Sequence, residues 1–231
     1  MIKPRLLDAF CGEGGCSVGY ARAGFDVCLG VDINPMPRYP FDFLQYSALD
    51  FLEEHGHEYD FIHASPPCQT HSVTQNMAKA DYGHEDFLPQ TRALLQSLGV
   101  PYAIENVPGA PMLNPIKLRG DMFSLQVLRM RYFECSFEMV QPPMPQKRGK
   151  TSNNGKGYST LDNADFISVA GNNYRFTDGA KAMAIDWMSR DGLTQAIPPQ
   201  YTQWIGASWL EANGFDYRYP EITVPVQRRL L

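Results

Sequence analysis

The sequence predicts an α/β fold built on a mostly parallel β-sheet. In its first hundred residues, short apolar segments alternate with helix-like ones, and glycines or prolines separate them. Strands that alternate with helices in this way imply βαβ units, with helices on both faces of the sheet. The apolar fraction of 44% and the charged fraction of 19% are those of a folded chain, and 231 residues suit one domain of ordinary size.

The first half of the chain gives the clearest elements. Short apolar runs predict strands at 5–10, 25–31, 59–64 and 101–104. The segments between them predict helices at 17–23, 49–54 and 87–98. The first helix is expected to stop at Gly24, because glycine is favoured just past a helix end. Pro66 and Pro67 close the third strand abruptly.

The second half is less regular. Strands are expected at 130–138 and 166–170, and helices at 180–188 and 199–213. The stretch 141–158 between the two strands is rich in Pro, Gly, Asn, Lys and Arg, which favours a loop. The chain contains no internal repeat and no heptad pattern.

Charge and cysteine usage exclude several classes of protein. The net charge of −5 and pI of about 5.5 argue against non-specific nucleic-acid binding over the whole surface. Without a long apolar run, we expect neither a membrane helix nor a secretion signal. The five cysteines form no CxxC pair, which favours reduced thiols. We therefore expect a cytoplasmic protein.

A glycine-rich turn follows the first strand. The sequence Asp8-Ala9-Phe10-Cys11-Gly12-Glu13-Gly14-Gly15 places glycines between a strand and a helix, where the backbone can approach a ligand closely. Asp32 lies 20 residues after Gly12, at the end of the next strand, where a carboxylate binds ribose hydroxyls. The carboxylates Asp8 and Glu13 would repel a pyrophosphate, and Ser17 occupies the third glycine position of GxGxxG. These features favour S-adenosylmethionine (SAM) over NAD, although NAD and a turn without ligand remain alternatives.

Three further motifs carry candidate catalytic groups. In Ser65-Pro66-Pro67-Cys68-Gln69 the prolines hold Cys68 rigidly at a strand end, which favours a nucleophile over a buried structural cysteine. Glu105 ends the next strand and is a candidate for a partly buried acid whose pKa burial would raise. Arg129 and Arg131 alternate on a strand and would face the same side. The alternative for these arginines is two exposed surface side chains.

The four motifs DAFCGEGG, SPPCQ, ENV and RMR, in that order, resemble the cytosine-5 DNA methyltransferase family. The resemblance runs from Leu6 to about Gly206 and is strongest to small phage-encoded members. It implies a Rossmann-like SAM-dependent methyltransferase fold, SAM as cofactor, double-stranded DNA as partner, a monomer, and no metal or membrane. In this family the cysteine attacks carbon 6 of a flipped-out cytosine, so that carbon 5 can take the methyl group.

The resemblance also implies a role for each matching residue. The catalytic residues are Cys68 as nucleophile, Glu105 on the cytosine ring nitrogen, and Arg131 with Arg129 behind it. The residues implied in SAM binding are Asp8, Phe10, Cys11, Gly12, Gly14, Gly15, Asp32 (ribose), Ile33, Asp50 (adenine), Pro66 and Gln195. The segment 69–90 corresponds to a loop that closes on DNA, which makes Gln69 and Ser72 candidate DNA contacts. Gln195 stands where the family has asparagine, which leaves a modified SAM derivative open as the donor.

The region that would read the DNA sequence is very short. The chain divides into a predicted SAM-binding core at 1–134, a reduced target-recognition segment at 135–165, and a C-terminal part at 166–231 that completes the core. Within the reduced segment, a basic stretch without acidic residues contains Lys147, Arg148, Lys150 and Lys156. We expect this stretch to contact the DNA backbone, and a solvated basic loop is the alternative. So short a reader predicts a recognition site of about two to four base pairs.

Rival functions make different use of the same residues. All five histidines lie within thirty residues around Cys68, which would suit a zinc site or a Cys–His hydrolase. The HxH-x5-H spacing is not a standard zinc pattern, and a hydrolase leaves the glycine-rich turn unexplained. RNA cytosine-5 methylation is the closer rival. A DNA-binding regulator with an inactive methyltransferase fold is the non-enzyme alternative.

Overall fold

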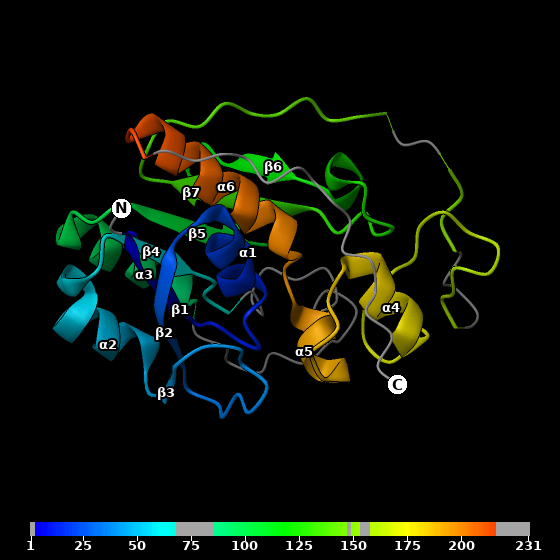
Figure 1. Cartoon of the computed structure of the whole chain (residues 1–231), viewed down its shortest axis with the longest axis horizontal. Helices are drawn as coiled ribbons and strands as arrows, with labels where there is room; N and C mark the ends of the chain where they lie inside the picture. Colours follow the sequence, from blue (N-terminus) through cyan, green and yellow to red (C-terminus); the bar gives the residue numbers. More distant parts are fainter. Residues whose placement is uncertain (1–2, 68–85, 147–148, 153–157, 216–231) are drawn as a thin grey trace.

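A seven-stranded β-sheet forms the centre of the computed structural model, in the order β3-β2-β1-β4-β5-β7-β6 (Figure 1). The structure describes residues 3–67, 86–146, 149–152 and 158–215. The strands are β1 (Arg5–Ala9), β2 (Asp26–Asp32), β3 (Phe43–Gln45), β4 (Phe61–Ala64), β5 (Tyr102–Asn106), β6 (Ile116–Leu118) and β7 (Arg131–Cys135). The helices are α1 (Gly15–Ala23), α2 (Ala48–His55), α3 (Phe87–Leu98), α4 (Phe176–Met183), α5 (Arg190–Gln195) and α6 (Pro199–Ala212), with 3-10 turns at Gly56–Glu58 and Gly120–Phe123.

The sheet is parallel from β3 through β5 and antiparallel at its far edge. β7 pairs antiparallel with both β5 and β6. The chain runs outward from β1 to β2 and β3 and then returns to place β4 on the other side of β1. Ligands of open α/β sheets bind at the carboxyl ends of the strands beside such a switch point. This switch point lies between the glycine-rich turn after β1 and the Ser65-Pro66 corner after β4.

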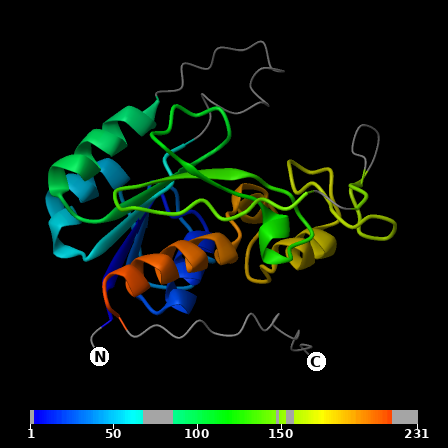
Figure 2. The ribbon, with the colours of Figure 1, turned by 90° about the horizontal axis from the view of Figure 1, so that it is seen from above.

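Helices cover both faces of the sheet, as expected. α2 and α3 lie on one face, and α1 and α6 lie on the other (Figure 2). Neighbouring strand residues contribute to opposite cores, because side chains alternate along a strand: Leu6 packs on the α1–α6 side, and Leu7 on the α2–α3 side. Phe61 and Ile62 divide in the same way. The predicted α/β fold with a mostly parallel sheet is therefore confirmed.

Several elements differ from the sequence-based expectation. β3, β6 and α5 were not expected. The segment 166–170, expected as a strand, makes only the isolated bridges Val127–Ile167 and Thr151–Phe166. The helix expected at 180–188 is α4, which begins earlier and ends at Ala184, whose left-handed φ of 54° breaks it. None of the helices in the described ranges is long and apolar enough to cross a bilayer.

The first and last helices cross closely because Gly19 has no side chain. A Cβ atom at Gly19 would lie 2.0 Å from Oγ1 of Thr202 and 2.2 Å from the carbonyl oxygen of Pro199. Thr202 also donates a hydrogen bond to the carbonyl oxygen of Cys16, at 2.8 Å. The crossing fastens α6 to the glycine-rich turn, from which α1 begins.

Gly19→Ala is expected to lower the free energy of unfolding by about 2–3 kcal/mol, because the added methyl group overpacks this crossing. Urea unfolding of the variant and the wild type measures the loss. Glu211→Ala, at an exposed position of α6, is the control and should change stability by less than about 0.5 kcal/mol. Equal stability of Gly19→Ala and wild type would contradict the close packing of α1 and α6.

Candidate functional site

A cavity of about 1150 Å³ lies at the carboxyl ends of the parallel strands. Its walls come from the glycine-rich turn, the ends of β2, β4 and β5, the segment around Arg129 and Arg131, and two later stretches near 167–171 and 188–197. The stretch near 167–171 was not expected to form a wall, whereas the stretch near 188–197 contains Gln195, which was expected at the cofactor site. For the stretch near 167–171, the only sign of a wall in the sequence is Gly171, which follows the apolar residues Val169 and Ala170.

The glycine-rich turn bends through left-handed backbone conformations. Phe10 has a φ of 57°, unusual for a residue with a side chain, and Gly12 has a φ of 51°. The amide of Gly12 donates to Oδ2 of Asp32 at 3.2 Å, and the amide of Asn34 donates to Oδ1 at 2.9 Å. These contacts fix the Asp32 carboxylate at the cavity wall. Backbone strain of this kind is typical of ligand-binding turns.

Most of the predicted cofactor residues line this cavity. They are Phe10, Cys11, Gly12, Gly15, Asp32, Ile33, Pro66 and Gln195. Three do not reach it. Gly14 lies against Tyr39 and Pro40, where a Cβ atom would meet the Pro40 ring at 2.7 Å. Asp50 is exposed in the first turn of α2.

Asp8 is the third exception, and its role differs from the one predicted. Its side chain is fully buried below the turn, where Ser17 Oγ donates to Oδ2 and Tyr39 OH lies 2.6 Å from the same Ser17 oxygen. Oδ1 has no hydrogen-bond partner. Burial raises the pKa of Asp8 to about 8. Asp8 therefore supports the turn from below and does not face a cationic ligand.

Glu105 is a buried carboxyl group at the cavity wall, as the sequence predicts. Nε of Arg131 lies 3.0 Å from Oε1 of Glu105, and the two side chains are 17% and 8% exposed. Oε1 accepts no well-directed hydrogen bond. Burial raises the pKa of Glu105, and the Arg131 and Arg129 charges partly oppose this effect. Glu105 therefore holds its proton to a higher pH than an exposed glutamate does.

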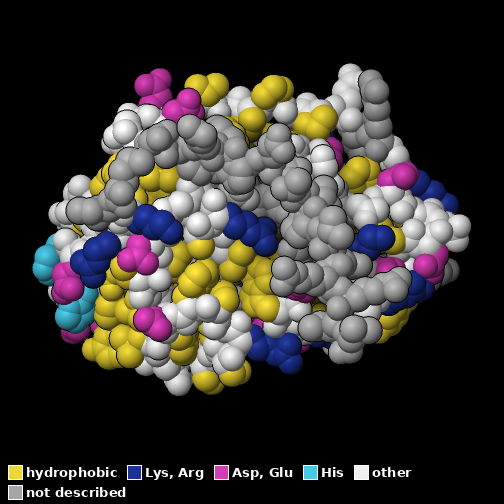
Figure 3. Space-filling model, in the orientation of Figure 1, with side chains coloured by type: hydrophobic (Ala, Val, Ile, Leu, Met, Phe, Trp, Pro, Cys, Tyr) yellow, Lys and Arg dark blue, Asp and Glu magenta, His cyan; other side chains and the backbone are white. Residues whose placement is uncertain are grey.

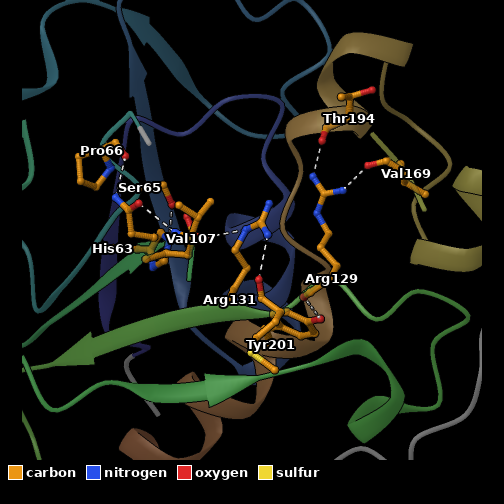
Figure 4. A network of polar contacts seen from close by, with 12 residues as sticks. His63, Ser65, Pro66, Val107, Arg129, Arg131, Val169, Thr194 and Tyr201 are labelled. Carbon is orange, nitrogen blue, oxygen red and sulfur yellow. Dashed lines mark hydrogen bonds and ion pairs between the residues drawn. The ribbon is translucent and has the colours of Figure 1, made fainter. Parts of the chain in front are cut away.

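Arg129 lines the same cavity but serves mainly to hold its far wall (Figure 4). Its guanidinium donates to the carbonyl oxygen of Val169 at 2.7 Å and to that of Thr194. Its Nε is buried without a partner. Burial lowers the pKa of Arg129 to about 9, with Arg131 contributing. Of the two predicted arginines, Arg131 contacts the acid and Arg129 supports α5.

Glu13 holds the other end of α5. Its carboxylate accepts hydrogen bonds from the amide of Ser189 at 2.6 Å and from the Ser189 hydroxyl at 2.5 Å. The Trp187 indole donates to the carbonyl oxygen of Glu13 at 2.9 Å. Both oxygens of this carboxylate are therefore engaged with the chain, so Glu13 is not the free anionic group that the sequence suggested.

The sequence did not single out His63 and Ser65 as site residues, but the structure places both at this site. His63 is fully buried on β4; its Nε2 is 3.0 Å from Ser65 Oγ and its Nδ1 is 3.2 Å from Tyr20 OH. Burial lowers the pKa of His63 to about 3, so the ring is neutral. Ser65 lines the cavity. The signal in the sequence was the pairing of two polar side chains, two residues apart, at the end of an apolar strand.

Several predicted residues lie outside the described part of the chain. They are Cys68, Gln69, Ser72, Lys147, Arg148 and Lys156. Pro67, directly before Cys68, lines the cavity. Lys150 is exposed and immediately precedes Thr151, which also lines the cavity. On the face shown in Figure 3, the described Lys and Arg side chains are scattered among acidic and apolar ones.

The histidines that suggested a zinc site are dispersed where the structure describes them. His55 is half-exposed beside Glu58, at 2.8 Å, whereas His63 is buried in the sheet. Among the described residues, no three His, Cys, Asp or Glu side chains are placed to hold a metal ion.

The burial of Asp8 predicts a pH dependence of stability. With a pKa of about 8 folded and about 3.9 unfolded, the folded state binds more protons between these values. Stability therefore falls as pH rises from about 4 to 8, by up to about 1.4 kcal/mol per pH unit.

Asp8→Asn removes this contribution. The stability of the wild type relative to the variant should therefore decrease as the pH rises from about 4 to 8. Urea unfolding at pH 5, 6, 7 and 8 measures the difference. A difference that is constant with pH would show that Asp8 is not a buried, protonated group.

The comparisons place this architecture among methyltransferases. No protein-family model matches the chain. Type II methyltransferase M.XorII from Xanthomonas oryzae pv. oryzae is 27% identical over 124 aligned residues, and the match covers 47% of this chain and 29% of the relative. The match thus spans less than a third of the length of that curated relative.

Two solved structures match nearly the whole chain. A prophage-encoded protein from E. coli, provisionally named a DNA modification methyltransferase, has a TM-score of 0.64 at 15% identity, covering 90% of this chain and 99% of its own. A methyltransferase from Entamoeba histolytica has a TM-score of 0.58 at 12% identity, covering 92% and 99%. The chain has the Rossmann-like fold of these methyltransferases.

Proposed function

We propose that this protein is a SAM-dependent DNA cytosine-5 methyltransferase. The observation that carries the proposal is the buried Glu105–Arg131 pair at the wall of a cavity that the glycine-rich turn also lines. The motif that contains Cys68 begins at the same wall, with Pro66 and Pro67. The names of the relatives, which include a type II and a DNA modification methyltransferase, support methyl transfer to DNA.

The cavity suits SAM by its size and by the donors and acceptors that line it. Gly12 and Gly15 allow close approach to the backbone, and the fixed Asp32 carboxylate suits the ribose hydroxyls of a nucleoside. Gln195, on α5, offers an amide from the opposite wall. When bound, SAM supplies an activated methyl group next to the catalytic residues.

The protein's own residues would prepare the cytosine. The Cys68 thiolate forms a bond to carbon 6, and the electron pair of the 5,6 double bond then becomes available at carbon 5 for the methyl group. Glu105 donates a hydrogen bond or proton to ring nitrogen 3, which accepts the developing charge, and Arg131 holds Glu105 in place. A water molecule then takes the proton from carbon 5, the electrons of that C–H bond restore the 5,6 double bond and expel Cys68 as a thiolate, and ring nitrogen 3 returns its proton to Glu105.

Covalent trapping tests this function. Duplex DNA with 5-fluorocytosine at the target position should form a denaturation-resistant adduct with the protein in the presence of SAM, because fluorine blocks the last step. Cys68→Ser should form none, and Cys28→Ser, which alters a thiol on β2 outside the cavity, should react as the wild type. Adducts with transfer RNA instead of duplex DNA would reassign the substrate, and the absence of any adduct would contradict the proposal.

Glu105→Gln is expected to slow methyl transfer by about 10²–10³-fold while changing SAM affinity by less than about threefold, because it alters proton donation in the transition state. Single-turnover kinetics and isothermal calorimetry separate the two effects.

Glu134→Gln is the matched control, since Glu134 is also a buried glutamate paired with an arginine, Arg92 at 2.8 Å, but it lies outside the cavity. It should keep the wild-type rate at a temperature where it is folded. A large loss of SAM binding in Glu105→Gln would place Glu105 in the cofactor site instead.

A further inference from the structure

Three polar side chains lead from the core to the proposed catalytic acid. Tyr20 on α1 and His63 on β4 are both fully buried, and Ser65 follows at the cavity wall. Tyr20 OH lies 3.2 Å from Nδ1 of His63. Nε2 of His63 lies 3.0 Å from Ser65 Oγ, and both of these residues are labelled in Figure 4. No step of the proposed reaction uses these three groups directly.

The register of the sheet directs this group of side chains toward Glu105. β4 and β5 are parallel, with His63 opposite Ala103 and Ala64 opposite Ile104. Ser65 is therefore the next partner position to Glu105. Because side chains alternate along a strand, His63, Ser65 and Glu105 all lie on the face that α1 covers. Arg131 on β7 reaches the same carboxyl group from the other side.

The chemistry of the donors favours one direction for these hydrogen bonds. A buried tyrosine hydroxyl needs a partner, and His63 Nδ1 is the partner that Tyr20 has among the described residues. If Tyr20 donates its proton to Nδ1, the neutral ring must carry its own proton on Nε2. Nε2 then donates to Ser65 Oγ, which leaves the hydroxyl proton of Ser65 free to point to another acceptor.

The acceptor is the Glu105 carboxyl group. The Cys16 thiol on α1 also faces Ser65, but sulfur is a weak acceptor compared with a carboxylate. We propose that Tyr20, His63 and Ser65 form a directional chain of hydrogen bonds that holds the Ser65 hydroxyl as a donor to Glu105. His63 and Tyr20 are thus positioning residues, and Ser65 touches the acid itself.

The consequence is a control over the protonation of Glu105. Burial raises the pKa of Glu105, whereas Arg131, Arg129 and the hydrogen bond from Ser65 lower it. Among the residues that the structure describes, Cys16 also faces Glu105, and His63 contributes no charge because it stays neutral. Without the Ser65 donor, the acid should hold its proton to a higher pH. This part of the inference rests on the proposed cytosine reaction, in which Glu105 must donate a hydrogen bond. The hydrogen bonds from Tyr20 to Ser65 therefore set the upper pH limit of activity.

The test begins with measurements that require no catalysis. In ¹⁵N spectra of histidine-labelled protein, assigned with His63→Gln, the His63 ring should be neutral and protonated on Nε2 from pH 5 to 8. Tyr20→Phe should abolish this preference, and Tyr102→Phe, which removes a tyrosine hydroxyl from β5 outside the chain of bonds, should leave it intact. A ring protonated on Nδ1 in the wild type would overturn the proposal.

The second measurement is the titration of the Glu105 carboxyl carbon by ¹³C spectroscopy. In Ser65→Ala its midpoint should rise by about one pH unit, the size expected for the loss of one hydrogen bond to a charged group. Ser65→Thr, which keeps the hydroxyl, should restore the wild-type midpoint, and circular dichroism verifies that both variants are folded. An unchanged midpoint in Ser65→Ala would overturn the proposal.

Catalysis supplies the third measurement and separates this inference from the proposed function. In single-turnover methyl transfer, the decline of rate at high pH should move upward by the same amount in Ser65→Ala as the ¹³C midpoint. If the spectra behave as expected but no cytosine is methylated, the hydrogen-bond chain stands and the proposed function fails. If methylation occurs with an unchanged pH profile, the control of Glu105 fails and the proposed function stands.

Discussion

The burial of the Glu105 carboxyl group is the constraint around which the site is built. Removing a carboxylate from water costs several kcal/mol unless other groups compensate. The compensation comes from Arg131 on β7, with Ser65 at the end of β4. The antiparallel direction of β7 beside β5 makes the contact with Arg131 possible. β7 places Phe133 opposite Glu105, so that Arg131, two residues earlier on the same face, extends past the carboxyl group into the cavity.

The cavity combines a rigid half with a half that side chains hold in place. Strand ends and the glycine-rich turn form the first half, and their positions follow from the backbone pairing of the sheet. The second half is α5 and the segment around Val169, which belong to no sheet and are too short to be stable alone. Glu13 and Arg129 fasten them from opposite ends. Two charged side chains that the sequence suggested for direct chemistry are thus used to build the pocket.

The sequence predicted well those features that local patterns determine. The helix 87–98 was located to the residue, because Asp86 caps its start and Gly99 ends it in a left-handed conformation. β3 could not be predicted, since three residues carry no periodicity and the strand exists through its pairing with β2. Asp8 and Glu13 were misinterpreted for a related reason. Their residue type suggests a ligand, but the burial of Asp8 beside Ser17 and the hydrogen bonds of Glu13 with Ser189 depend on the tertiary fold.

The crossing of α1 and α6 has a consequence for synthesis of the protein. The residues that meet there, Gly19 and Thr202, are separated by most of the chain, so folding must close a very long loop before this contact forms. Loop closure of this length slows folding more than it weakens the folded state. On the ribosome, the parallel strands can assemble as they emerge, but the cavity has no second wall until α5 and α6 leave the exit tunnel. The nascent chain therefore acquires its ligand pocket only after α6 has been synthesised, and a bound ligand stabilises the folded protein but not its precursors.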